Sequence, residues 1–258
     1  MTGPEDFWAL GDYAAVAPRL QPLADDLVDV ANLVHGSRVL DVAAGTGNVS
    51  VAASQRGARV LACDISPAMI EAGRARTRAD KLHVEWRECD AQSLPLPDRA
   101  FDAALSAFGV MFAPDPDRAA GELLRVVRPG GTVALASWSD AGVWPAVNEP
   151  IAEALSFEGP NPLDWGDPEL VRARFGNRVR SLDVFEREAS WVFADVDEAC
   201  AWFELGAGWA SAQATVDPGV YEELQVRKRA AVERFAQPAS GGGVELRPVY
   251  LVVRARVR

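Results

Sequence analysis

The stretch VLDVAAGTGNVS, residues 39 to 50, is the most informative part of the sequence about the fold. Branched apolar residues surround Asp41, as in a short buried strand of a parallel sheet. Gly45 and Gly47 follow; they permit backbone angles closed to other residues and let a ligand approach the main chain. A helix is predicted from Asn48 onward. Strand, glycine-rich turn and helix are typical of a nucleotide-type cofactor site at the carboxyl edge of an α/β sheet, although a tight turn without a ligand can have the same pattern.

Strand and helix patterns alternate along the next hundred residues. The predicted strands cover residues 38–42, 59–64, 82–88, 101–106 and 131–137, and the predicted helices cover 18–33, 48–56, 67–79 and 116–127, the last one followed by an RPGG turn. Alternation of this kind predicts a parallel, doubly wound sheet.

The pattern is looser after residue 138. We expect a helix over 168–175, a strand over 181–193, a mostly helical stretch over 196–236 and a final strand over 244–256. Because the helical stretch separates two strands that could pair in one sheet, we interpret it as an insertion over the cofactor edge. The chain then divides into an N-terminal helical cap (1–37), a cofactor-binding core (38–138) and a remainder (139–258), which completes the sheet and carries a substrate-binding lid at 140–166 and 196–238.

Composition narrows the function classes. The net charge of −11 and the pI of 4.7 argue against nucleic-acid binding, which needs a basic surface. No apolar run approaches the roughly 20 residues of a membrane span, and the N-terminus does not resemble a signal peptide. Cys63, Cys89 and Cys200 lack C-x-x-C spacing and there are only two histidines, so we expect no metal site and a cytoplasmic protein. A homodimer is left open.

Three acids stand at successive predicted strand ends. Asp64 follows the glycine-rich turn by about 20 residues, where a carboxylate can accept hydrogen bonds from a ribose diol; it could equally cap the helix that starts at Ser66-Pro67. Asp90, after the third strand, could accept from an exocyclic amine. Asp41, Asp64 and Asp90 would share one edge, which three unrelated helix caps do not explain well.

Two other kinds of nucleotide-binding motif, the dinucleotide fingerprint and the P-loop, match the sequence less well. The dinucleotide fingerprint G-x-G-x-x-G fails at position 50, which is Ser50, and the Gly-Lys-Ser/Thr of a P-loop is absent.

Five segments in order resemble a known family: VLDVAAGTG, ACDISPAMI, CDAQSLPLPD, FDAALSAFGVMFAPD and LLRVVRPGGTVALASW. They are similar to the motifs of class I S-adenosylmethionine-dependent methyltransferases, particularly small-molecule enzymes such as the ubiquinone and menaquinone methyltransferases. The similarity is specific over 38–138 and looser through WGDPELV and the terminal VYLVVRA. One departure is Ala43-Ala44, where the family often has Gly-Cys. The resemblance implies a mostly parallel, doubly wound, seven-stranded Rossmann-like sheet with a helical lid before its last strand, and S-adenosylmethionine as cofactor.

The resemblance also implies cofactor contacts. Asp41 would fix the amino group of the methionine portion, Asp64 the ribose hydroxyls and Asp90 the adenine amine. The other predicted cofactor residues are Ala43, Gly45, Thr46 and Gly47 at the methionine portion, Ile65 and Met69 on the adenine, the Ala91 backbone beside Asp90, Ser106 near the amino group, and Arg19 at the carboxylate, where a surface helix arginine is an equally good reading.

The acceptor is inferred from aromatic residues in segments expected over the same edge. Trp8, Tyr13, Phe112, Trp138, Trp144, Trp165 and Trp209 are predicted to line its pocket, although any one of them could belong to the core. Together they favour methyl transfer to an apolar or aromatic small molecule. No catalytic base is assigned, because His35 precedes the first predicted strand and His83 lies early in the third, so both would be remote from the edge. A cyclase on the same fold is the alternative, and a vestigial regulatory protein is disfavoured by the intact acids.

Overall fold

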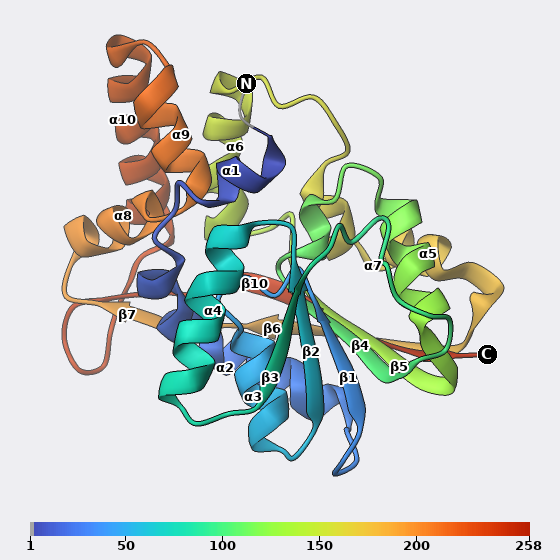
Figure 1. Ribbon diagram of the computed structural model, residues 1–258. Helices are drawn as coiled ribbons and strands as arrows, with labels where there is room; N and C mark the ends of the chain where they lie inside the picture. Colours follow the sequence, from blue (N-terminus) through green and yellow to red (C-terminus); the bar gives the residue numbers. More distant parts are fainter. Residues whose placement is uncertain (1–2) are drawn as a thin grey trace.

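The computed structural model describes residues 3–258 and contains a seven-stranded sheet (Figure 1). Its strand order is β3-β2-β1-β4-β5-β10-β6. Only β10 runs antiparallel to its neighbours, β5 and β6. The expectation of a mostly parallel doubly wound sheet of seven strands is confirmed. The strands are β1 (Arg38–Val42), β2 (Arg59–Asp64), β3 (Val84–Glu88), β4 (Phe101–Ala107), β5 (Val127–Trp138), β6 (Val179–Glu188) and β10 (Val249–Val257).

The strand order reverses between β1 and β4, and this reversal determines where the helices lie. Right-handed crossovers that run in opposite directions from this point place their helices on opposite faces of the sheet. One face carries α2 (Tyr13–Ala31), α3 (Asn48–Gln55) and α4 (Pro67–Ala79); the other carries α5 (Pro116–Val126) and α7 (Pro168–Phe175). Ligands of open α/β sheets bind at the carboxyl ends of the strands beside such a reversal.

Apolar side chains between these layers form the core. Leu40 and Leu105 from the central strands and Leu27 and Leu123 from opposite helix layers are at most 1% exposed. Each buried leucine of this kind contributes roughly 1.5–3 kcal/mol relative to an exposed one. The central strands are therefore held on both faces, which fixes the positions of the residues at their carboxyl ends.

A group of helices beyond the sheet forms a second layer of structure. We call it the helical bundle: α6 (Val143–Ala154), α8 (Val196–Glu204), α9 (Ala207–Thr215) and α10 (Pro218–Phe235), which pack on one another at the upper left of Figure 1. The N-terminal α1 (Pro4–Trp8) contacts α9. A small antiparallel sheet, β7 (Trp191–Phe193), β9 (Val244–Leu246) and β8 (Gln237–Pro238), connects the bundle to the main sheet. Three short 3-10 helices complete the order: η1 (Val110–Phe112), η2 (Pro162–Gly166) and η3 (Gly176–Arg178).

The predicted strands 181–193 and 244–256 were wrong in extent, because each divides in two. β6 ends at Glu188 before β7 begins, and β9 ends before β10 begins. Pro248 lies at the second break and has no N–H for a ladder hydrogen bond. Its carbonyl accepts a hydrogen bond from the Ala189 N–H at the first break, 3.0 Å away, so the two segments leave the main sheet side by side.

Two other boundaries differ from prediction. The helix expected from residue 18 begins at Tyr13, because the Asp12 carboxylate accepts the Ala15 N–H at 3.1 Å and caps it. The RPGG segment is a bulge within β5 and not a separate turn: Phe101 pairs with Val127, and Ala103 next pairs with Thr132.

No helix in residues 3–258 combines the length and the apolar character needed to cross a membrane.

Candidate cofactor and acceptor site

The glycine-rich turn after β1 presents bare backbone on one side. Gly45 has φ +54°, and no atom lies within 4 Å of the position where a Cβ would be, so this side is open to a ligand. Gly47 has φ +87°, and a Cβ there would lie 3.0 Å from the Trp86 ring. The turn is thus packed from beneath and open above, as a cofactor cradle requires.

Asp41 lies beneath this turn and is 1% exposed. Its Oδ2 accepts a hydrogen bond from Ser50 Oγ at 2.6 Å, whereas its Oδ1 is buried without a partner. Burial raises the pKa of Asp41 to about 7, and the Ser50 hydrogen bond opposes that rise. Buried acceptors almost always have a donor, so Oδ1 is suited to one supplied by a ligand. Ser50, which the sequence analysis used only to exclude a dinucleotide site, is the residue that orients this carboxylate.

Asp64, at the end of β2, joins the turn to the start of α4. Its Oδ2 accepts the Gly45 N–H at 2.8 Å and its Oδ1 accepts the Ser66 N–H at 2.9 Å. Burial raises the pKa of Asp64, and these backbone hydrogen bonds oppose the rise. Each carboxylate oxygen has a second lone pair, so contacts to ribose hydroxyls are compatible with the bonds already made.

Asp90, just after β3, completes the row of acids. It is half-buried, and its Oδ1 accepts from the Gln92 backbone N–H at 2.8 Å. The Cys89 N–H donates to the Asp64 carbonyl at 3.0 Å, which joins the second and third strand ends. Because β1, β2 and β3 are adjacent and parallel, the three predicted acids do lie along one edge.

Several other predicted cofactor residues surround this edge. Thr46, Met69 and Ser106 are buried, and Ile65 and Ala91 are half-buried. Ser106 Oγ accepts the Val110 N–H at 3.1 Å and so fixes the chain that leaves β4.

Arg76 of α4 is a supporting residue that the sequence analysis missed. It donates to the Thr46 carbonyl at 3.4 Å, to Gln21 Oε1 at 2.6 Å and to Asn48 Oδ1. These bonds join the turn to three helices. An arginine in the last turn of a helix gives no local signal of such a role, because basic residues are common there.

Arg19 contacts the small sheet and the bundle. Its guanidinium donates to the Val192 carbonyl at 2.8 Å, lies 3.8 Å from the centroid of the Phe193 ring and contacts Glu198 at 3.5 Å. These contacts attach α2 to the base of the bundle. A role toward the cofactor carboxylate stays a prediction.

Three of the predicted acceptor residues, Trp138, Trp165 and Trp209, are each 1% exposed and belong to the core. Trp138 stacks between Phe108, 4.0 Å away between ring centroids, and Trp144, at 4.3 Å. Contact of these indoles with an acceptor stays a prediction.

Trp144, also predicted, is half-buried against Trp138 and Phe203, and its contact with an acceptor stays a prediction. The remaining three, Trp8, Tyr13 and Phe112, lie with Phe7 and Phe157 in a partly exposed group that we call the aromatic rim. Ring centroids are 4.8 Å apart for Trp8 and Phe112, 6.3 Å for Trp8 and Tyr13, and 5.6 Å for Phe7 and Phe157. Phe112 is 39% exposed and Phe157 58%.

The aromatic rim adjoins the glycine-rich turn. Gly109, which precedes η1, lies so close to Ala43 that a Cβ on it would be 2.6 Å from the Ala43 Cβ. Tyr13 Oη accepts the Ala207 N–H of α9 at 3.4 Å. Burial raises the pKa of Tyr13 to about 12, and the charge of Asp64 adds to that rise. Tyr13 therefore stays protonated at neutral pH, and it lies close enough to Asp64 for the charge of that carboxylate to affect its pKa.

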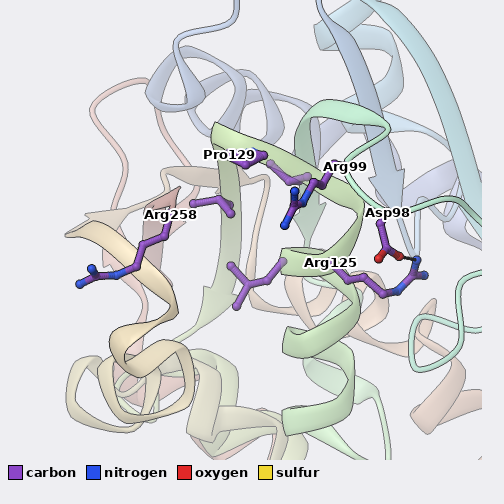
Figure 2. Close-up of a pocket in the computed structure, with 8 residues that line it drawn as sticks. Asp98, Arg99, Arg125, Pro129 and Arg258 are labelled. Carbon is purple, nitrogen blue, oxygen red and sulfur yellow. Dashed lines mark hydrogen bonds and ion pairs between the residues drawn. The ribbon is translucent and has the colours of Figure 1, made fainter.

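A pocket of about 240 Å³ lies elsewhere, at the amino ends of β4 and β5 (Figure 2). Arg125 on its wall is already bound by Asp98 and Glu122, each at 2.7 Å. His35 and His83 also precede strands, and no group of three or more metal-ligating side chains occurs within residues 3–258. The three acids and the open turn are therefore at the opposite edge from this pocket.

Comparison with known proteins gives the family. The model of a methyltransferase domain matches residues 40–135. One protein of Mycobacterium tuberculosis, itself described as uncharacterized, is 40% identical over 185 residues, which cover 70% of this chain and 68% of that protein. The chain belongs to the class I S-adenosylmethionine-dependent methyltransferases.

Other proteins are similar over part of their length or in fold. A second uncharacterized M. tuberculosis protein is 42% identical over 179 residues, and the match spans 65% of its length, just under two thirds. The demethylmenaquinone methyltransferase of Clavibacter sepedonicus is 38% identical over 137 residues, covering 53% of this chain and 49% of that enzyme. The solved structure of YcgJ from Bacillus subtilis has the same fold, with a TM-score of 0.64 at 17% identity, covering 92% of this chain and 99% of that one.

The cofactor of this family is S-adenosylmethionine, and the site has features that fit it. The unpartnered Asp41 Oδ1 would receive the cationic amino group, the open side of Gly45 leaves room for the methionine portion, and Asp64 stands at the strand end used for ribose.

Cofactor affinity should rise with pH through about 7. Unliganded Asp41 has a pKa of about 7, so it is largely neutral at pH 6, whereas the cofactor amino group prefers the ionised carboxylate. We expect binding to release a proton and the Kd to be about tenfold lower at pH 8 than at pH 6, as measured by calorimetry. Asp41→Asn should bind more weakly with little pH dependence; a parent protein whose Kd does not change over this range would contradict the role of Asp41.

Burial of Asp41 also makes the free energy of unfolding depend on pH, in the opposite direction to cofactor affinity. Its folded pKa lies above the ordinary carboxyl value, so between that value and about 7 only the folded state holds the proton. This contribution to stability is lost as pH rises through that interval.

Ala43→Gly should stabilise the protein by about 0.5–1 kcal/mol, because Ala43 has φ +53° in the left-handed region, where only glycine is unstrained. Urea unfolding measures the change. Ala44→Gly is the matched control and should destabilise, since Ala44 is not among the positive-φ residues. Equal effects at the two positions would contradict strain at Ala43.

Proposed function

We propose that the protein transfers a methyl group from S-adenosylmethionine to an apolar or aromatic small molecule. The observation that carries the proposal is the buried Asp41 carboxylate with an unpartnered oxygen beneath an open glycine turn, in line with Asp64 and Asp90. A vestigial protein would have no reason to keep a half-satisfied buried acid at this position.

When bound, S-adenosylmethionine supplies a methyl group on a positively charged sulfur, a good leaving group. The chain would then need mainly to bind, orient and exclude water. Asp41, held by Ser50, and Asp64, held by two backbone donors, are fixed before any ligand arrives. Such positioning can account for roughly 7–11 kcal/mol of barrier lowering.

No histidine is assigned as a general base, because His35 and His83 precede β1 and β3 at the opposite edge. Tyr13, with its pKa raised to about 12, is a proton donor and not a base at neutral pH. We infer that the acceptor presents an atom that is already nucleophilic.

The aromatic rim and the helical bundle are proposed to enclose the acceptor. Trp8 and Phe112 offer flat apolar faces next to the turn, and Tyr13 links the rim to α9 of the bundle. Aromatic faces with few polar groups favour a largely apolar ligand. Free thiols at Cys63, Cys89 and Cys200 agree with a reducing compartment, and we propose the cytoplasm.

The decisive experiment uses S-adenosylmethionine labelled in its methyl group with a metabolite extract of the source organism. Mass spectrometry should find a small apolar metabolite that gains one labelled methyl group, and Asp64→Ala should reduce its yield. Cofactor binding without label transfer, together with an unlabelled rearranged product, would establish a cyclase instead.

A further inference from the structure

Two of the three thiols lie together at the ends of β2 and β3. Cys63 of β2 is paired with Arg87 of β3, and Cys89 follows Arg87 by two residues, so both cysteine side chains are on the same face of the sheet. They are in contact, because the two thiols share a hydrogen bond. Thiols in contact across neighbouring strands need only a short further approach to reach the S–S bond length of about 2.05 Å.

The two thiols differ in reactivity. The hydrogen bond from Cys63 lowers the pKa of Cys89, and the charge of Arg87 adds to this effect, whereas burial opposes it. The same hydrogen bond and burial raise the pKa of Cys63. Cys89 is 7% exposed and Cys63 1%, and β3 is an edge strand on which Glu85 and Arg87 are exposed. A thiol of lowered pKa beside a more deeply buried second thiol is the arrangement of a peroxide-sensitive cysteine and its resolving partner.

Both cysteines are connected to the cofactor edge through their main chains. Cys63 precedes Asp64, and its carbonyl accepts the Ala44 N–H of the glycine-rich turn at 2.9 Å. Cys89 precedes Asp90, and its N–H donates to the Asp64 carbonyl at 3.0 Å. Drawing the two sulfurs together would therefore move the turn and both acids relative to one another.

We propose that Cys63 and Cys89 form a reversible oxidation site, at which a hydroperoxide generates a disulfide that weakens binding of S-adenosylmethionine. The Cys89 thiolate attacks the O–O bond of hydrogen peroxide, becomes a sulfenic acid and releases hydroxide. The Cys63 sulfur then attacks the sulfenic sulfur, the S–S bond forms, and the departing oxygen leaves as water with the Cys63 proton. The pair loses two electrons, which the peroxide gains.

Exchange with a thiol such as glutathione would reverse the bond. A transient disulfide of this kind is compatible with a reducing compartment. The inference concerns the cofactor site and not the acceptor, so it applies equally to methyl transfer and to cyclisation.

The first test identifies the bond. The protein is treated with hydrogen peroxide, its remaining thiols are alkylated under denaturing conditions, and its tryptic peptides are mapped by mass spectrometry. We expect peptides 60–74 and 88–99, which contain Cys63 and Cys89, to be joined with the loss of two hydrogens and to separate after dithiothreitol. Cys200 should be recovered alkylated. Absence of this cross-link, or a link to Cys200 in its place, would overturn the inference.

Variants assign the two roles. Cys63→Ser should leave Cys89 as a sulfenic acid that dimedone traps, whereas Cys89→Ser should give no dimedone adduct at Cys63. If Cys63→Ser does not fold, Cys63→Ala replaces it, because the site is apolar. Cys200→Ser is the matched control and should form the disulfide as the parent does. A dimedone adduct on Cys63 in the Cys89→Ser protein would overturn the assigned order of attack.

Calorimetry measures the consequence for the cofactor site. The oxidised parent should bind S-adenosylhomocysteine at least about tenfold more weakly than the reduced parent, which corresponds to the loss of one hydrogen bond to a charged group, and dithiothreitol should restore the affinity. By reciprocity, saturating S-adenosylhomocysteine should disfavour the disulfide in a glutathione redox buffer by the same factor.

Two outcomes would show that the disulfide does not control the site. One is a disulfide that forms while the Kd stays unchanged. The other is a loss of affinity on peroxide treatment that persists in Cys89→Ser, because it would come from another residue such as Met69.

Discussion

Asp64→Ala should raise the Kd for S-adenosylhomocysteine about 10- to 100-fold. Hydrogen bonds to a charged group contribute about 1.5–3 kcal/mol, and the variant loses those predicted to the ribose. It also leaves the Gly45 and Ser66 N–H groups without their acceptor, so the glycine turn loses its support. Calorimetry measures the affinity and thermal unfolding the stability.

Asp102→Ala provides the matched control. Asp102 also accepts a backbone N–H, from Arg38 at 2.7 Å, and pairs with Arg128 at 2.5 Å, but it lies at the amino end of β4. We expect Asp102→Ala to lower the melting temperature without changing the Kd. If both variants raised the Kd equally, the effect of Asp64→Ala would come from general destabilisation and not from a lost cofactor contact.

Trp209→Ala should cost about 3–5 kcal/mol of unfolding free energy, the usual effect of deleting a buried indole. Trp209 is 1% exposed on α9, its ring lies 4.5 Å from Lys228 Nζ and 6.4 Å from the Tyr221 ring centroid, and Lys228 is itself 1% exposed. Removing the ring therefore opens a cavity beside a buried ammonium. The melting temperature should fall by about 10 °C, while cofactor affinity changes little.

Trp209→Phe, which keeps most of the apolar volume, should recover much of this loss. A Trp209→Ala protein with unchanged melting temperature but impaired acceptor kinetics would instead place the indole in the acceptor pocket, as the sequence analysis predicted.

The sheet and its row of acids could be predicted because their signals are local. A strand in a parallel sheet is a short apolar run, and Asp41 and Asp64 stand where such runs end. The supporting contacts could not be predicted in the same way. Arg19 meets Val192 and Arg254 meets Asp183 across long sequence separations, and nothing in the neighbouring residues indicates these pairs.

The aromatic residues show a different limit of sequence reasoning. Trp138 and Trp8 are the same type of residue, and both were predicted to lie near the carboxyl edge. Trp138 is enclosed by Phe108 and Trp144, whereas Trp8 is partly exposed in the rim. Burial depends on how distant elements pack. Trp138 is the last residue of β5 and Trp8 is the last residue of the short α1, and at the end of an element periodicity does not indicate burial.

The small sheet below the bundle has a consequence for how such a protein can diversify. The chain enters helices α8 to α10 after β7 and returns through β8 and β9. Strands β7 and β9 pair directly, with Trp191 opposite Leu246 and Phe193 opposite Val244. Entry and exit are therefore neighbours, as at a site where domain insertion is tolerated. Helices α8 to α10 could be exchanged for others of different length without altering β6 or β10. Under the proposed function, in which the bundle helps to enclose the acceptor, replacing this one continuous piece of the gene would change the enclosure and leave the strands that carry Asp41 and Asp64 as they are.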